Sequence, residues 1–169
     1  KNGRVTFGCL NNFCKISPGA LLCWQKLLTA VPDSRLLLYC HEGTGRDNIR
    51  RAMASGGVDP SRVEFIKRLG FFKYMESYQD IDIALDPFPF NGGITTCDAL
   101  WMGVPVISLV GQRAVGRAGY SILTQAGMPE LAAHSIDEYI QKAAGLARDP
   151  ARLCEIHSSL RDRMRISPL

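Results

Sequence analysis

The stretch IDIALDPFPFNGGITTCDALWMGVPVISL, residues 81–109, contains the pattern that decides the fold of this chain. Its two ends, residues 81–86 and 104–109, are short, apolar and rich in β-branched residues, as in strands covered on both faces. Between them, the Asn-Gly-Gly sequence at 91–93 predicts a tight turn, followed by a helix that begins near Thr95 and ends at Gly103. The stretch therefore predicts a buried strand, a glycine turn, a short helix and a second buried strand.

The same alternation of strands and helices continues along the chain in both directions. Further strand-like runs occupy residues 4–10, 35–40 and 62–67, with a short one near 131–134. Helical patterns occupy residues 18–31, 45–57, 72–79 and about 113–126, and two closing helices are opened by Ser135 with Glu138 and by Pro150. This spacing predicts one α/β domain over residues 1–169, a Rossmann-like, doubly wound parallel sheet.

Composition excludes several classes of protein. The chain has 169 residues, 46% of them hydrophobic, and a net charge of +4 that is scattered, so we expect no nucleic-acid partner. No apolar run approaches the roughly 20 residues that cross a bilayer, so we expect no membrane partner either. The six cysteines lack paired metal-ligand spacing, which favours reduced thiols in a cytoplasmic protein. Lys1 opens directly onto a strand, so we expect a piece of a longer protein.

Ligands of open parallel sheets bind at the carboxyl ends of the strands, and two loops there carry suitable residues. After the predicted strand at 81–86, Gly92 and Gly93 allow close approach to a helix N-terminus that favours phosphate. The hydroxyls of Thr95 and Thr96 would add donors, and Asp98 would accept hydrogen bonds from ribose hydroxyls. Spacing alone gives an equally good alternative, because Thr95-x-x-Asp98 is also a helix-capping box with no ligand.

Lys15 favours the ligand hypothesis. It lies in the loop after the first predicted strand, where its cation could face the glycine turn and clamp a pyrophosphate. The chain lacks G-x-G-x-x-G after that strand and G-x-x-x-x-G-K-[ST] anywhere, which disfavours dinucleotide oxidoreductases and P-loop NTPases. The acidic sequence DID at 80–82 resembles a metal-binding D-x-D, but it falls at the amino edge of its strand, so we interpret it as structural. We expect no metal site.

These residues carry a resemblance to a known family. NNFCKISP (11–18), DIALDPFPFNGGITTCDALWMGVPVISL (82–109), GQRAVGRAGYSIL (111–123) and the terminal RISPL resemble the carboxyl-terminal half of the catalytic region of O-GlcNAc transferases, above all bacterial ones with tetratricopeptide repeats. The resemblance implies one lobe of a two-lobed GT-B glycosyltransferase, with the other lobe and the repeats outside this chain. It implies a UDP-GlcNAc donor, no cofactor, and an acceptor protein bound by the missing parts.

The resemblance also assigns roles to individual residues. Lys15 matches the family lysine at the diphosphate, and we take it as the catalytic residue that stabilises the leaving UDP. The matching donor-binding positions are Asn12, Lys15, Tyr74, Gly92, Gly93, Thr95, Thr96 and Asp98. Tyr74 stands where relatives have a histidine near the nucleoside, and Ile94 where many have threonine. Arg113 and Arg117 are weaker candidates near the cleft.

The implied reaction is inverting transfer of the sugar to a Ser or Thr hydroxyl, and we expect this chain alone to be inactive. Two alternatives stay open. The chain could belong to a transferase of another UDP-sugar, such as glucose. The differences at Tyr74 and Ile94 also fit a degenerate lobe that serves only as an interaction module.

Overall fold

A six-stranded parallel sheet organises the chain in the computed structural model, which describes residues 3–169. The strand order is β3-β2-β1-β4-β5-β6, and every pair of neighbours is parallel. The strands are β1 (Thr6–Cys9), β2 (Arg35–Tyr39), β3 (Val63–Ile66), β4 (Ile83–Leu85), β5 (Val106–Leu109) and β6 (Ala132–Ala133). The predicted Rossmann-like α/β fold is therefore confirmed, although each strand is shorter than its apolar run.

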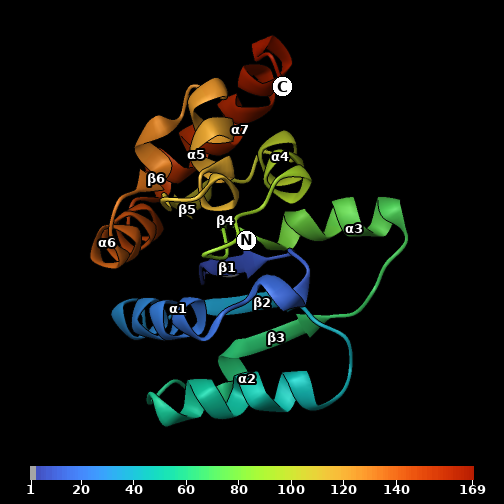
Figure 1. The fold of residues 1–169 in the computed structure, drawn as a ribbon, viewed down its shortest axis with the longest axis vertical. Coiled ribbons are helices and arrows are strands. Elements are labelled where there is room, and N and C mark those ends of the chain that lie inside the picture. The colour runs from blue at the N-terminus through green and yellow to red at the C-terminus, as the bar shows by residue number, and fades with distance from the viewer. Residues whose placement is uncertain (1–2) are drawn as a thin grey trace.

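Helices cover both sides of this sheet. They are α1 (Pro18–Ala30), α2 (Thr44–Ser55), α3 (Phe71–Ser77), α4 (Ile94–Trp101), α5 (Ala118–Gln125), α6 (Ile136–Ala147) and α7 (Pro150–Ile166). In Figure 1, α1 and α6 lie on one side of the strands and α3 and α4 on the other. Helix α1 packs against α6 and α2, whereas α4 packs against α7 and α5. This arrangement makes the fold doubly wound.

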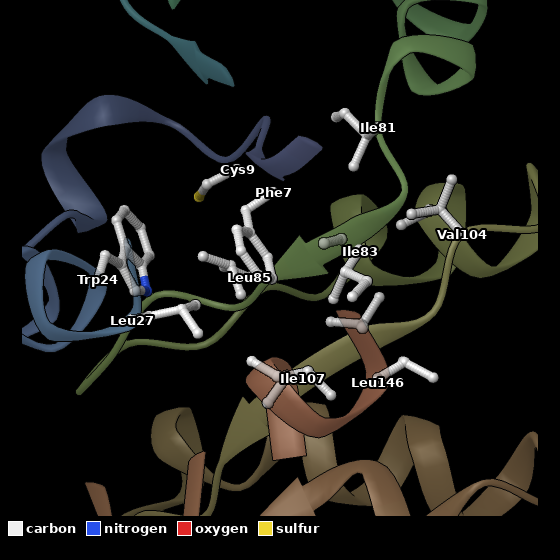
Figure 2. Packing of buried hydrophobic residues seen from close by; sticks show 14 of the residues in the cluster. Phe7, Cys9, Trp24, Leu27, Ile81, Ile83, Leu85, Val104, Ile107 and Leu146 are labelled. Carbon is white, nitrogen blue, oxygen red and sulfur yellow. The ribbon is translucent and has the colours of Figure 1, made fainter. Parts of the chain in front are cut away.

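The sheet and helices meet in one apolar core. Phe7, Ile83 and Ile107 come from three neighbouring strands and are fully buried, and Figure 2 shows them between Trp24 of α1 and Leu146 of α6. The indole of Trp24 donates to the Tyr139 hydroxyl at 3.3 Å, which satisfies the one polar atom of that side chain. The core thus fixes the strand ends that carry the loops above the sheet.

Side chains cap several helix starts, among them the start predicted at Ser135. Ser17 accepts from the amide of Ala20, with Pro18 in the first turn of α1. Ser135 accepts from the amide of Glu138, and the Glu138 carboxylate accepts from the His134 amide, which holds its pKa below the ordinary value. These contacts satisfy helix amides that would otherwise lack partners.

The predicted helix at about 113–126 is divided. A 3-10 turn spans Ala114–Gly116, and α5 begins only at Ala118. The division arises because the turn is tied to neighbouring loops: the Gly111 amide donates to the Gly116 carbonyl at 2.6 Å, and the Asn91 amide donates to the Val115 carbonyl at 2.9 Å. A continuous helix would break these bonds.

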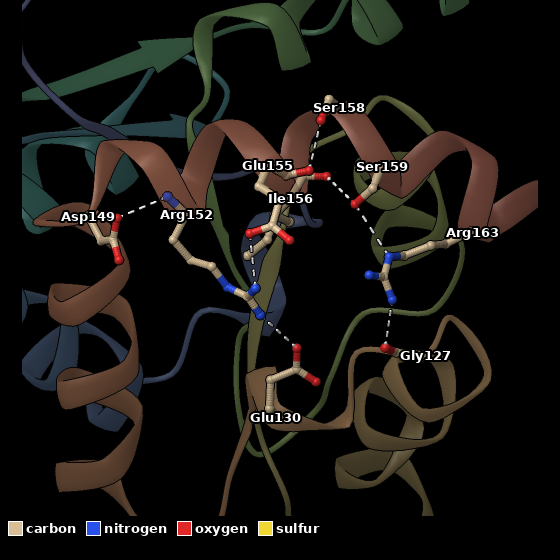
Figure 3. Close-up of polar contacts among 9 residues, drawn as sticks. All are labelled: Gly127, Glu130, Asp149, Arg152, Glu155, Ile156, Ser158, Ser159 and Arg163. Carbon is tan, nitrogen blue, oxygen red and sulfur yellow. Dashed lines mark hydrogen bonds and ion pairs between the residues drawn. The ribbon is translucent and has the colours of Figure 1, made fainter.

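Arginines near the carboxyl terminus lie on the exposed side of α7, and several also form contacts. Figure 3 shows Arg152 paired with Glu155 and Glu130, and Arg163 bonded to the Gly127 carbonyl. These arginines tie α7 to the segment that leads into β6. Exposed ion pairs of this kind contribute about 1 kcal/mol or less.

The Asp82 side chain has a structural contact, as predicted from its place at the amino edge. Its carboxylate accepts from the Thr6 amide at 2.8 Å, which joins the starts of β4 and β1.

All six cysteines are free thiols. Across residues 3–169, no helix combines the length and apolar character needed to cross a membrane.

Candidate functional site

The strand order places two loops at the point where the direction of strand winding reverses. Strands β1 and β4 are neighbours in the centre of the sheet, and the chain leaves them toward α1 and α4 on opposite sides. The loops that follow, residues 10–17 and 86–93, therefore border a crevice at the carboxyl edge, where ligands of such sheets bind. Both loops were singled out from the sequence.

Lys15 crosses from the first loop to the second. Its Nζ atom donates to the Asn91 carbonyl at 2.9 Å and lies 4.4 Å from the centre of the Phe90 ring. The Asn12 side chain supports it, because its Oδ1 atom accepts from the Cys14 amide and starts the 3-10 turn that ends at Lys15. An ammonium group has three donors, and the Asn91 carbonyl uses one, so Lys15 keeps donors for an anion.

The start of α4 provides further donors beside Lys15. Within residues 3–169, no acceptor is bonded to the backbone amides of Gly93, Ile94 and Thr95. A helix N-terminus also carries partial positive charge, so unpaired amides there suit a phosphate. Gly93 has open space around its Cα atom, which leaves the backbone accessible. We call Lys15 and these three amides the anion clamp.

Gly92 is required for a different reason. A Cβ atom at this position would collide with the hydroxyl of Thr96 and the carboxylate of Asp86. Its amide instead donates to Asp86 Oδ1 at 2.6 Å. Gly92 thus anchors the turn from inside, while Gly93 forms its accessible surface.

Asp86 is a buried carboxylate that the sequence analysis did not identify. It is 1% exposed and accepts from the Ser108 hydroxyl at 2.6 Å in addition to Gly92. Burial raises its pKa to about 6, while the hydrogen bonds and the charge of Lys15 act in the opposite direction. The signal available in the sequence was a lone aspartate at the carboxyl end of a buried strand.

The two threonines face different surroundings. The Thr95 hydroxyl donates to Asn11 Oδ1 at 2.6 Å, which joins the start of α4 to the end of β1. Thr96 is 2% exposed, and its hydroxyl lies 3.5 Å from Asp86 Oδ1, so its side chain points into the interior and not toward the crevice. Asn11, like Asp86, was not among the predicted site residues.

The capping-box alternative for Thr95 and Asp98 is wrong. Helix α4 begins at Ile94 with Gly93 as its N-cap, and no side chain caps it. Thr95 lies inside the first turn, and Asp98 accepts at Oδ2 from the Tyr74 hydroxyl at 3.1 Å. Burial raises the pKa of Asp98, and the bond from Tyr74 lowers it. Both side chains are consequently held by neighbouring elements and not by the amides of their own helix.

Two hollows adjoin the anion clamp. A cleft of about 440 Å³ adjoins Thr95 and is lined by Leu10, Asn12, Tyr39, His41, Arg68, Leu69, Tyr74 and Thr95. A second hollow of about 400 Å³ adjoins Phe90 and is lined by Pro89, Phe90, Gly111, Gln112, Arg113, Val115 and Gly116. The first holds aromatic rings and polar groups suited to a flat heterocycle, and the second is mainly apolar.

The remaining predicted residues can also be placed. Arg113 is exposed and lines the second hollow, whereas Arg117 is exposed and donates weakly to the Gly111 carbonyl at 3.4 Å. The structure thus brings Asn12, Lys15, Gly93, Thr95, Asp98 and Tyr74 around one crevice. Among residues 3–169, no three His, Cys, Asp or Glu side chains are grouped so that they could hold a metal ion.

Comparison with known proteins identifies the family of the chain. The family model described as Glycosyl transferase family 41 matches residues 1–169. The chain is 38% identical to the Arabidopsis thaliana protein named probable UDP-N-acetylglucosamine–peptide N-acetylglucosaminyltransferase SPINDLY, and 39% identical to its Oryza sativa subsp. japonica counterpart. Each match spans 172 residues and covers 99% of this chain and 19% of the relative, so the chain spans about a fifth of their length.

Solved structures extend the comparison to the fold. A mutant of the Thermobaculum terrenum O-GlcNAc transferase superposes with a TM-score of 0.92 at 38% identity, over 95% of this chain and 32% of that one. Staphylococcus aureus TarM superposes with a TM-score of 0.71 at 14% identity, which is a likeness of fold alone. The match of the family model over residues 1–169 establishes that the chain belongs to glycosyl transferase family 41.

Proposed function

We propose that this chain is the donor-binding lobe of a protein O-GlcNAc transferase and that it binds UDP-GlcNAc through the UDP group. The observation that carries the proposal is the anion clamp, in which Lys15 reaches from the loop after β1 to the Asn91 carbonyl, in the turn that leads to the unpaired amides at the start of α4. A diphosphate fits a site that combines a lysine cation with oriented backbone amides. The family membership and the names of the relatives support the same donor.

The rest of the donor follows from the two hollows. With the diphosphate at the clamp, the nucleoside would enter the cleft beside Asn12 and Tyr74, and Asp98 would accept from the ribose hydroxyls. A nucleotide sugar carries its sugar at the other end of the diphosphate, so the sugar would extend toward Phe90. This order uses both hollows and leaves Asp98 away from the phosphates, where a carboxylate would be repelled.

The proposed reaction is inverting glycosyl transfer. A Ser or Thr hydroxyl of an acceptor protein attacks the anomeric carbon, the bond from that carbon to the β-phosphate oxygen breaks, and UDP leaves with the electron pair. Lys15 and the amides of Gly93, Ile94 and Thr95 would stabilise the charge that develops on this oxygen. The hydroxyl proton would go to a base outside this chain.

Acceptor recognition would also lie outside this chain, because the curated relatives are about five times longer. We infer that a second lobe and tetratricopeptide repeats bind the acceptor protein and that the chain alone does not turn over. A cytoplasmic location fits the six free thiols.

The decisive experiment is titration calorimetry of UDP into the intact protein and into Lys15→Ala, at low and moderate salt. Losing a charge-assisted contact to a phosphate costs about 1.5–3 kcal/mol, so we expect affinity to fall about 10- to 100-fold. Lys26→Ala removes an exposed lysine of α1 as the matched control and should leave binding unchanged. Wild-type binding should weaken with salt, and that dependence should decrease in Lys15→Ala.

Other results would redirect the proposal. Equal UDP affinity in Lys15→Ala and wild type would contradict the clamp. A panel of GDP, ADP and CDP, together with UDP-GlcNAc and UDP-glucose, tests the donor, and a preference for another member would indicate a transferase of a different nucleotide sugar. Absence of binding to every member in the intact protein would favour the non-catalytic interaction module.

A further inference from the structure

Two tyrosines of the α3 region form a hydroxyl chain to α4. The Tyr74 hydroxyl lies 2.8 Å from the Tyr78 hydroxyl and 3.1 Å from Asp98 Oδ2, and the Tyr78 hydroxyl lies 3.1 Å from the Thr95 carbonyl. Tyr78 is 2% exposed, so solvent does not satisfy its hydroxyl. The chain therefore joins the edge of the cleft to the first turn of α4.

The hydroxyl chain is short of one hydrogen. A carboxylate and a carbonyl can only accept, so the two tyrosines supply the only two hydrogens for three contacts when Asp98 is ionised. The contact at 2.8 Å has the usual length of a bond between hydroxyl and oxygen, so it also needs a hydrogen. With Tyr78 donating to Thr95, the Tyr74 hydrogen has two competing acceptors, Asp98 and Tyr78.

We propose that Tyr74 and Tyr78 are positioning residues that couple the orientation of Asp98 to recognition of the ribose hydroxyls. In the structure, the Tyr74 hydroxyl donates to Asp98 and fixes the orientation of its carboxylate. When a ribose hydroxyl donates to Asp98, the Tyr74 hydrogen is released to Tyr78, and the bonds from Tyr74 to Tyr78 and from Tyr78 to Thr95 are both complete. This inference rests on the proposed placement of the ribose at Asp98.

The coupling gives the ribose hydroxyls an additional contribution to binding. A ribose hydroxyl that reaches Asp98 makes its own bond, while the Tyr74 hydrogen exchanges its bond to Asp98 for a bond to Tyr78. The additional contribution comes from the chain that results, from Tyr74 to Tyr78 to the Thr95 carbonyl, because successive bonds in a chain strengthen one another. A nucleotide without these hydroxyls leaves Tyr74 on Asp98 and gains neither bond. Discrimination between UDP and 2′,3′-dideoxy-UDP therefore measures the coupling.

The aromatic rings could also act only through packing, because they meet edge to face with centroids 5.5 Å apart. Replacing either tyrosine with phenylalanine separates these roles, since the ring stays and the hydroxyl is lost. Loss of packing would weaken UDP and 2′,3′-dideoxy-UDP equally. Loss of the coupling would weaken UDP alone.

The test is calorimetry of UDP and 2′,3′-dideoxy-UDP with the intact protein, Tyr78→Phe, Tyr74→Phe and the double variant. A hydrogen bond contributes about 0.5–1.5 kcal/mol, so Tyr78→Phe should bind UDP about 2- to 10-fold more weakly and leave the dideoxy affinity unchanged. The double variant should lose no more discrimination than Tyr78→Phe, because both changes break one chain. Tyr120→Phe is the matched control on α5 and should keep the wild-type ratio of affinities.

Two results would overturn the inference separately from the proposed function. If wild type discriminates between the nucleotides and Tyr78→Phe keeps the same ratio, the coupling is wrong and Asp98 still binds ribose. If wild type binds UDP through Lys15 but does not discriminate, the ribose is not at Asp98, and the inference fails while the clamp stands.

Discussion

The two edges of the sheet differ in how far the hydrogen bonds of their polar groups are satisfied within the protein. At the amino edge, the Arg62 guanidinium donates to the carbonyls of Leu28, Val31 and Ser34 at 2.8–2.9 Å. At the carboxyl edge, Lys15 has one carbonyl acceptor, and the amides at the start of α4 have none among the described residues. Polar groups whose hydrogen bonds are saturated within the protein stabilise the fold, whereas groups with unused donors are available to a ligand. The difference between the two edges therefore locates the site without reference to any relative.

Arg62→Leu should give the largest effect. It should remove hydrogen bonds at the amino edge and leave the carboxyl edge unchanged. It would leave the carbonyls of Leu28 and Ser34 without this donor, at about 1–3 kcal/mol each, whereas the Val31 carbonyl keeps the Ser34 amide and hydroxyl as donors. We therefore expect the free energy of unfolding to fall on the order of 4 kcal/mol. Binding of UDP below the new melting temperature should stay the same. Urea unfolding and calorimetry measure the two quantities.

Arg4→Leu is the control for this prediction. Arg4 is exposed and lines a hollow at the amino edge together with Arg62, and it forms no hydrogen bond or ion pair within the described chain. Its replacement should leave stability within about 0.5 kcal/mol of wild type. Weakened nucleotide binding in Arg62→Leu at a temperature where it is folded would show that the edges are not independent.

Asp86 is the group at the carboxyl edge that combines both behaviours, because it is saturated and yet lies under the anion clamp. Its pKa is raised from 3.8 to about 6, so the folded protein holds the proton more tightly than the unfolded chain. The resulting stabilisation is complete below pH of about 4 and is lost as pH rises to about 6, and its full size is about 3 kcal/mol.

Asp86→Asn should remove this dependence on pH. The amide oxygen can still accept from Gly92, so the turn is retained while titration is abolished. Urea unfolding between pH 4 and pH 7 should show a smaller loss of stability in the variant than in wild type. Asp162→Asn, on the exposed side of α7, is the control and should show the same pH dependence of stability as wild type. If the unfolding free energy changes equally with pH in all three proteins, Asp86 does not titrate in this range.

Much of the fold followed from local patterns. The strand runs, the caps at Ser17 and Ser135 and the glycine turn at 91–93 each act within a few residues, so the sequence states them directly. The anion clamp was also predictable in outline, because parallel strands bring their carboxyl ends to one edge. Lys15 and Gly93 could be paired on that ground alone.

What the sequence did not indicate depends on contacts between distant residues. Asp86 meets Ser108 only through the pairing of β4 and β5, and Asn11 meets Thr95 only through that of β1 and β4. The side chain of Thr96 points inward because of its position around the helix axis. That position depends on where the helix begins, and α4 begins at Ile94 and not at Thr95 as predicted. A one-residue shift in the start of a helix turns a side chain by about 100°, and no local signal fixed that residue.

Phe90→Ala should give the smallest effect. It tests whether an exposed apolar side chain at the carboxyl edge contributes to ligand binding, as the unsaturated polar groups there are expected to do. Phe90 is 48% exposed, lines the second hollow and supports Lys15 through its ring. If the sugar extends toward this ring, loss of the ring should weaken UDP-GlcNAc about 2- to 10-fold more than UDP, since stacking on an exposed ring contributes about 0.5–1.5 kcal/mol. Any support of Lys15 by the ring would weaken both ligands equally, so the ratio of the two affinities isolates the sugar.

Phe72→Ala is the matched control, because Phe72 is 81% exposed on α3 and lines neither hollow. It should leave both affinities unchanged. If the ratio of UDP-GlcNAc to UDP affinity in Phe90→Ala equals the wild-type ratio, the sugar does not bind at the second hollow. The second hollow would then remain an apolar cavity of about 400 Å³ beside the clamp, and its occupant would have to come from another part of the intact protein.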